Sequence, residues 1–104
     1  MPNFLLIYHG GKEPETPEEG EQMMAAWMAW FNDMGDAVVD GGNPVGQSYT
    51  VSASGITHDG GANPVSGYTV IAADSQDAAC EMAKGCPIMG EGGSIEVAEI
   101  HEVG

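Results

Sequence analysis

Four side chains that could transfer a proton lie at expected strand ends: His9, Asp40, His58 and Asp59. Histidine titrates near neutral pH, and a carboxylate beside it can take part in the transfer. Loops at strand ends commonly hold such sites. The sequence therefore gives a candidate catalytic set in which His9 acts with Asp59 or Asp40.

Each of these residues also has a purely structural interpretation. His9, expected just past its strand, can be an exposed loop histidine. Asp40 and Asp59 each precede a glycine, as turn-forming aspartates do. His58 and Asp59 are neighbours, so in an extended backbone they point to opposite faces and do not pair directly. Both interpretations stay open at this point.

No metal or tightly bound cofactor is expected. By residue type, the candidate ligands for a divalent cation are His9, His58, His101, Asp40 and Asp59. No local spacing such as His-x-x-x-His supports them. Cys80 and Cys86 are six residues apart, a spacing typical of neither zinc nor redox motifs. We therefore expect two reduced thiols and no disulfide.

The charge balance excludes several classes of partner. The chain has 16 acidic residues, two lysines and no arginine, and its formal net charge is −14. That charge repels nucleic acids and anionic membrane surfaces. An anionic substrate usually needs a fixed cationic clamp, and only Lys12 and Lys84 are available. No apolar run approaches the ~20 residues that span a bilayer. The start of the chain has no basic region before Phe4–Tyr8, so no signal peptide and a cytoplasmic location are expected.

The clearest expected element is a helix after residue 16. Thr16 suits the N-cap, Pro17 the first helical position, and Glu19 completes a capping box. Gly35 is a natural C-terminal stop. The large apolar side chains at helical spacing are Met23, Trp27, Trp30 and Met34. One tryptophan should pack in the core and the other nearer its edge.

The other elements complete one domain over residues 1–104. Expected strands are Asn3–Tyr8, Ala37–Gly41, Tyr49–Val51, Gly67–Ala73 and Ser94–Val97, and Ser75 caps a second helix over Gln76–Lys84. Ile56–His58 either continues the third strand or forms a short piece of its own. Two Asn-Pro turn signals, at Asn43 and Asn63, flank this middle region.

This order predicts an α+β fold: a ferredoxin-like βαββαβ sandwich whose antiparallel sheet has both helices on one face. Leu5, Ile7, Tyr68 and Val70 do not alternate cleanly with polar residues, so the other face of the sheet is also apolar. A second copy of the chain is the simplest cover for that face. The sequence therefore predicts a homodimer.

The ordered set of these segments resembles a YCII-related (DGPF-type) domain. The segments that carry the resemblance are Phe4–Tyr8, the Trp27/Trp30 helix, Asp59-Gly60, Gly67–Ala72, Cys86-Pro87 and Gly93–Val97. Such domains belong to the dimeric α+β barrel group, in which two sheets face each other. Gly61-Ala62 replaces the Pro-Phe of the family signature. The histidine that some relatives carry in the first helix has no counterpart here, so the resemblance implies no dyad of that kind.

Two functions from different classes follow. The favoured one is a non-catalytic dimeric module that binds a small organic ligand or a protein partner, with Tyr8, Trp30, His58 and Tyr68 as candidate ligand-binding residues. It predicts an apolar pocket without a converging titratable pair. The alternative is a cofactor-independent enzyme of the isomerase or lyase type. It predicts a histidine and a carboxylate within hydrogen-bond reach in a pocket.

Overall fold

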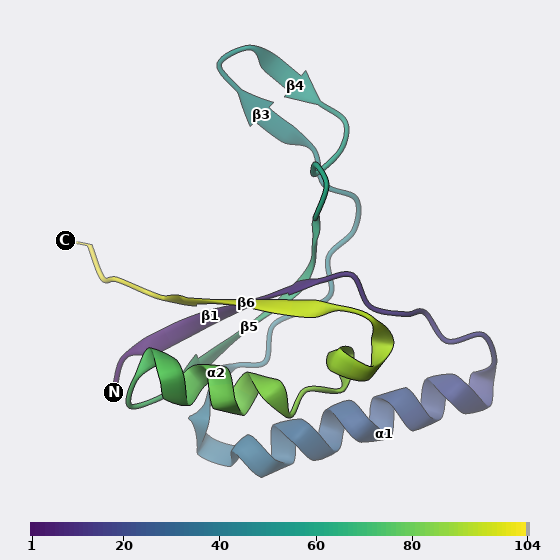
Figure 1. The fold of residues 1–104 in the computed structure, drawn as a ribbon, viewed down its shortest axis with the longest axis vertical. Coiled ribbons are helices and arrows are strands. Elements are labelled where there is room, and N and C mark those ends of the chain that lie inside the picture. Colours follow the sequence, from purple (N-terminus) through teal and green to yellow (C-terminus); the bar gives the residue numbers. More distant parts are fainter. Residues whose placement is uncertain (104) are drawn as a thin grey trace.

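A four-stranded antiparallel sheet forms the centre of the protein, and both helices lie on one of its faces (Figure 1). The structure, a computed structural model, describes residues 1–103. Along the chain the elements are β1 (Asn3–His9), α1 (Pro17–Met34), η1 (Gly35–Ala37), β2 (Val38–Asp40), β3 (Thr50–Ser52), β4 (Gly55–Thr57), β5 (Val65–Ala72), α2 (Gln76–Lys84), η2 (Pro87–Glu91) and β6 (Ser94–Glu99). The strand order across the sheet is β2-β5-β1-β6. The fold is therefore α+β, as predicted.

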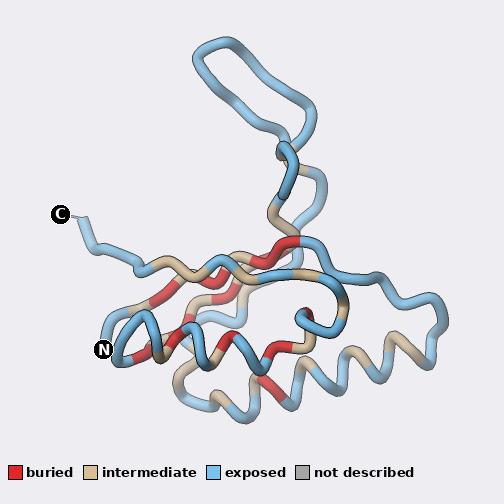
Figure 2. The backbone as a smooth tube through the Cα atoms, in the orientation of Figure 1, coloured by how far each residue is buried: buried red, intermediate tan, exposed pale blue. Residues whose placement is uncertain are grey.

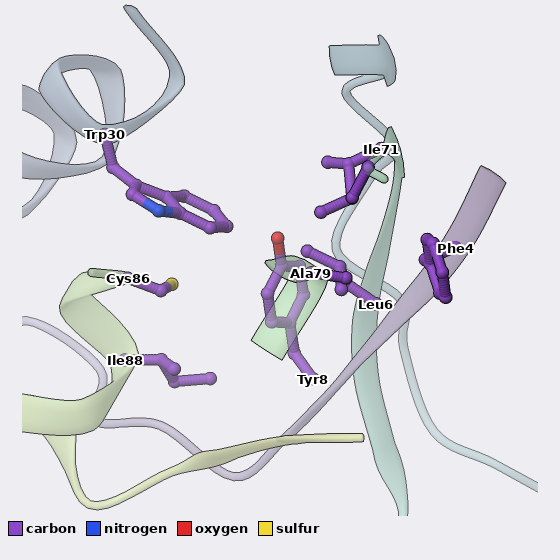
Figure 3. Close-up of a cluster of buried hydrophobic side chains, with 9 residues drawn as sticks. Phe4, Leu6, Tyr8, Trp30, Ile71, Ala79, Cys86 and Ile88 are labelled. Atoms are coloured by element: carbon purple, nitrogen blue, oxygen red, sulfur yellow. The ribbon is translucent and has the colours of Figure 1, made fainter. Parts of the chain in front are cut away.

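Strand β1 lies between β5 and β6 and contributes side chains to both faces of the sheet. Phe4, Leu6 and Tyr8 are buried toward the helices, while Leu5 and Ile7 alternate with them and are half-buried on the other face. Figure 3 shows the buried cluster that the first three form with side chains from the helices. The prediction that His9 lies past the strand is wrong, because β1 continues through it and pairs it with Ser94.

Helix α1 begins and ends where its capping residues predict. The hydroxyl of Thr16 accepts a hydrogen bond from the backbone N–H of Glu19 at 3.1 Å, and the N–H of Gly35 donates to the carbonyl of Phe31. Trp30 is the buried tryptophan and donates from Nε1 to the carbonyl of Met82 at 2.9 Å. Trp27 lies at the edge of the core, so the two tryptophans divide as expected. In the part of the chain that the structure describes, no helix is both long and apolar enough to cross a membrane.

Helix α2 has the predicted bounds. Ser75 accepts a hydrogen bond from the N–H of Ala78 at 3.1 Å. The buried residues of this helix are Ala79 and Ala83, whose small side chains let the helix lie close to the sheet. Cys86 is buried just beyond the helix, Cys80 is exposed, and both are free thiols.

The middle of the chain leaves the sheet. Strands β3 and β4 pair only with each other and form a separate two-stranded ribbon. We call residues 46–64 the arm. Its root is closed by a bridge between Pro44 and Gly67 and by a bond from the N–H of Val45 to the carbonyl of Ser66. The arm projects from the sheet on the side opposite the helices, and residues 49–59 are all exposed (Figures 1 and 2).

The arm also explains the extended shape of the chain. The radius of gyration is 15.0 Å, whereas about 13 Å is typical of a folded chain of this length. The face of the sheet from which the arm rises carries the four apolar residues that the sequence indicated. Leu5 pairs with Val70, and Ile7 pairs with Tyr68, across β1 and β5. We call this the open face of the sheet.

Candidate functional site

A pocket in the described residues lies between the first half of α1 and the edge of the sheet. Its volume is about 430 Å³, which suits a small organic molecule. Helix α1 and the loop before it contribute Pro14, Gly20, Met23, Met24, Trp27 and Phe31. The sheet and the segment after β2 contribute Tyr8, Tyr68, Thr69 and residues 41–44. None of these residues carries a charge.

The buried hydroxyl groups of the pocket already bind each other. The Tyr8 hydroxyl lies 2.7 Å from Oγ1 of Thr69, and Thr69 donates to the carbonyl of Gly41 at 2.9 Å. Burial raises the pKa of Tyr8 from 10.0 to about 12. Tyr8 therefore stays neutral at physiological pH, and its hydroxyl is held by Thr69. A ligand in this pocket meets mainly apolar surface.

Aromatic rings shape the helix side of the pocket. Trp27 lies edge-on to Tyr8 with ring centroids 5.2 Å apart, and it contacts Trp30 and Phe31 in the same cluster. Its Nε1 donates to Oε2 of Glu91 at 3.3 Å. This bond and these aromatic contacts fix the orientation of the indole. The indole of Trp27 is therefore a preformed part of the pocket wall.

The opposite wall depends on a glycine. Gly42 has φ +72°, and a Cβ atom there would overlap the carbonyl oxygen of Tyr68. Asn43, the next residue, accepts a hydrogen bond from the N–H of Tyr68 at 3.2 Å. Only glycine has both the backbone freedom and the lack of a side chain that this close approach requires.

A histidine and a carboxylate meet elsewhere, on the open face. Nε2 of His9 lies 3.0 Å from Oε1 of Glu96 on β6, and Nδ1 lies 3.2 Å from the carbonyl oxygen of Pro64 at the end of the arm. The side chain of His9 is 10% exposed, whereas that of Glu96 is exposed to solvent. The bond to Glu96 is the main cause that raises the pKa of His9, and desolvation opposes it. Of the two interpretations of His9, the exposed loop histidine is therefore wrong.

The predicted catalytic carboxylates are in other places. Oδ1 of Asp40 accepts from the N–H of Gly42, and Oδ1 of Asp59 accepts from the N–H of Gly61, each at 2.9 Å. These are the turn contacts of the structural interpretation. The structure pairs His9 with neither of them.

The four predicted ligand-binding residues separate into three locations. Tyr8 and Tyr68 line the pocket. Trp30 is buried in the core, where its indole faces the same cluster as Cys86 and Ile88 (Figure 3). His58 stacks on Tyr49 in the arm, with ring centroids 4.6 Å apart. The tryptophan that lines the pocket is therefore Trp27 and not the predicted Trp30.

Sequence reasoning missed Glu96 as the partner of His9. A period-two reading of β6 places Glu96 on one face of the sheet, but only the register with β1 brings it beside His9. Within residues 1–103, no three His, Cys, Asp or Glu side chains come together in a way that could hold a metal ion.

No protein-family model, curated protein or solved structure matches this chain. The class of the protein therefore follows from its own fold: an α+β chain with one four-stranded antiparallel sheet, a two-stranded ribbon and two helices. The functional candidates follow from its own geometry, which separates an apolar pocket beneath α1 from a histidine–carboxylate pair on the open face.

Proposed function

We propose that this protein is a binding module for a small, neutral and largely apolar organic ligand, which lies in the pocket between α1 and the sheet. The observation that carries the proposal is the uncharged lining of a space of about 430 Å³. Charged ligands would lose their hydration there without gaining a counter-charge. An apolar ligand instead gains burial against Met23, Trp27 and Phe31.

A neutral fluorescent probe tests the proposal. N-phenyl-1-naphthylamine is expected to bind saturably with a rise in fluorescence, and energy transfer from the adjacent Trp27 and Trp30 should show that it binds near them. Gly20→Leu places a side chain in the pocket, and the first added carbon would meet only ordinary contacts with Pro14. We expect this variant to weaken binding at least about tenfold.

Ala29→Leu is the matched control, because Ala29 is exposed on the same helix and does not line the pocket. It should leave the probe affinity unchanged. Equal affinity of the wild-type protein and Gly20→Leu for the probe would refute this binding site. A circular dichroism spectrum of each variant shows whether the fold is intact.

The fold type within the α+β class, the family and the oligomeric state are also proposals. We infer a ferredoxin-like sandwich of the YCII-related type, in which the open faces of two copies meet in a dimeric α+β barrel. The strand order β2-β5-β1-β6, with both helices on one face, supports the sandwich. The pairs Leu5–Val70 and Ile7–Tyr68 on the open face support the dimer. Leu5→Lys should abolish the dimer in sedimentation analysis, because each protomer would then bury an unpaired cation in the interface.

A location in a reducing compartment, the cytoplasm, fits the same molecule. Cys80 and Cys86 are free thiols, and disulfides are rare in that compartment. The net charge of −14 supports the absence of nucleic-acid and anionic-membrane partners. A measured affinity for duplex DNA at 0.15 M salt would contradict this part of the proposal.

The second candidate function is cofactor-independent proton transfer, and the pair His9–Glu96 favours it. A histidine bonded to a carboxylate is a common general-base arrangement. The pair lies on the open face, so in the proposed dimer it would be enclosed between the two sheets. Deuterium exchange into small enolisable ketones or lactones, lost in His9→Gln, would support this function. No exchange above the solvent rate would eliminate it for the compounds screened.

A further inference from the structure

The arm is an amphipathic ribbon with one apolar side. Val51 pairs directly with Ile56, and the ring of Tyr49 stacks on His58. Because side chains alternate along a strand, both pairs lie on the same side of the ribbon. Thr50 and Thr57 pair on the other side. The arm therefore has a continuous apolar surface and a polar back.

That apolar surface is uncovered in a single chain. The exposed fractions are 61% for Tyr49, 75% for Val51 and 64% for Ile56. An isolated two-stranded hairpin has marginal stability in water. A ribbon of this kind is stabilised when another surface covers its apolar side. Figure 2 shows the arm as exposed apart from short intermediate stretches near its root, where Ser48 and Gly60 are half-buried.

The low charge of the arm favours a second copy of this chain as the surface that covers its apolar side. Asp59 is the one acidic residue in residues 46–64, so 15 of the 16 acids lie elsewhere in the chain. A basic partner would bind where those acids gather, for example along the start of α1. A second copy of this chain also has a charge of −14, so a nearly neutral surface of the chain approaches it with less repulsion than an acidic one. The arm is such a surface.

The direction of the arm fits the same partner. The arm rises on the side of the open face, away from both helices (Figure 1). Two sheets packed face to face are separated by about 10 Å. The arm has roughly nine residues on each side and can span about 30 Å. In a face-to-face dimer it must therefore pass the edge of the facing sheet and lie beside the other protomer.

We propose that the arm is a clasp for a second copy of this chain, and that the side formed by Tyr49, Val51, Ile56 and His58 packs on the other protomer. The inference rests on the dimer of the proposed function and adds its second contact surface. His9 holds the root of the arm to the sheet through Pro64, which fixes the direction in which the arm leaves.

The dimer dissociation constant, measured by sedimentation equilibrium, tests the clasp. The double variant Val51→Thr, Ile56→Thr keeps β-branched side chains in both strands and makes the apolar side polar. We expect its dissociation constant to rise at least about tenfold. The matched control is Thr50→Ser, Thr57→Ser on the polar back, which keeps both hydroxyls, including the one that donates to the carbonyl of Asp59. It should dimerise like the wild type.

The outcomes separate the two proposals. If the double variant Val51→Thr, Ile56→Thr has the same dissociation constant as the wild type, the clasp is overturned. The sheet-to-sheet dimer still stands in that case if Leu5→Lys dissociates it. A wild-type protein that stays monomeric at every concentration measured overturns both proposals. Hydrogen exchange of the unaltered protein gives an independent readout. The amides of residues 49–58 should gain protection above the dissociation constant, and equal protection at all concentrations would also overturn the clasp.

Discussion

Nε2 of His9 lies 3.0 Å from Oε1 of Glu96, and this pair joins the end of β1 to β6 at the root of the arm. The other ring nitrogen faces the carbonyl oxygen of Pro64 at 3.2 Å. A carboxylate and a carbonyl oxygen are both acceptors, so both ring nitrogens must carry a proton for both bonds to form. This arrangement therefore favours the imidazolium and links the charge of His9 to the position of the arm.

Removal of the carboxylate should lower the pKa of His9. In Glu96→Gln the charge-assisted bond that raises this pKa is lost, while partial desolvation of the ring remains. The pKa is measured from the imidazole resonances by NMR. Glu99→Gln is the control, because Glu99 is on the same strand and its nearest histidine is His101. A His9 pKa that is the same in Glu96→Gln and the wild type would contradict the assignment.

The raised pKa gives a stability effect with a defined sign. Since the pKa of His9 is higher in the folded protein than its unfolded value of about 6.5, the folded state binds the proton more tightly. Protonated His9 therefore contributes fully to the free energy of unfolding below about pH 6.5, and this contribution is lost as the pH rises through the pKa of His9 in the folded protein. The free energy of unfolding in urea should therefore differ more between wild type and His9→Gln at pH 6 than at pH 9. A difference that grows with pH would contradict this sign.

Gly42 should tolerate no side chain. Gly42→Ala would force a Cβ into the carbonyl oxygen of Tyr68 and strain a backbone with φ +72°. We expect a loss of at least about 2 kcal/mol in the free energy of unfolding. Gly46→Ala is the control, because nothing lies within 4 Å of its Cβ position and its φ is not in the positive range. Similar stabilities of the two variants would contradict the close approach of Gly42 to the carbonyl oxygen of Tyr68.

The two thiols should react at very different rates. Cys80 is exposed, whereas Cys86 is 3% exposed, and burial raises the pKa of Cys86 from 9.0 to about 11. Thiolates rather than thiols attack alkylating reagents, so both the burial of Cys86 and its raised pKa slow its alkylation. Iodoacetamide, a neutral reagent, should label one site in the native protein and two in urea, as peptide mass spectrometry can show. Equal native labelling would contradict the burial of Cys86.

Added salt should stabilise the protein. With a net charge of −14, the folded chain repels itself, and ions screen that repulsion over a Debye length of about 10 Å at 0.1 M. The midpoint of thermal unfolding should rise between 10 mM and 0.5 M sodium chloride. Glu13→Gln with Glu15→Gln removes two exposed charges and should give a smaller rise. A midpoint that falls with salt would show that ion pairs such as Lys12–Glu19 outweigh the repulsion.

Local signals in the sequence determined both helices. Thr16 and Ser75 accept the capping bonds that their positions predict, and Gln76–Lys84 has the predicted bounds. A cap depends on residues within one turn, so neighbours along the chain carry all the information that it requires. The strands were also located to within a few residues, because apolar runs and turn residues mark them.

Long-range pairing decided the rest. His9 and Glu96 are 87 residues apart, and a shift of one residue in the register of β1 and β6 would place them on opposite faces. The exposed ribbon of β3 and β4 has the same cause, since its short strands pair with each other and with no part of the sheet. The sequence by itself therefore determined which elements form and what caps them. Only the tertiary structure decided which side chains meet, because contacts between distant strands depend on the packing of the whole chain.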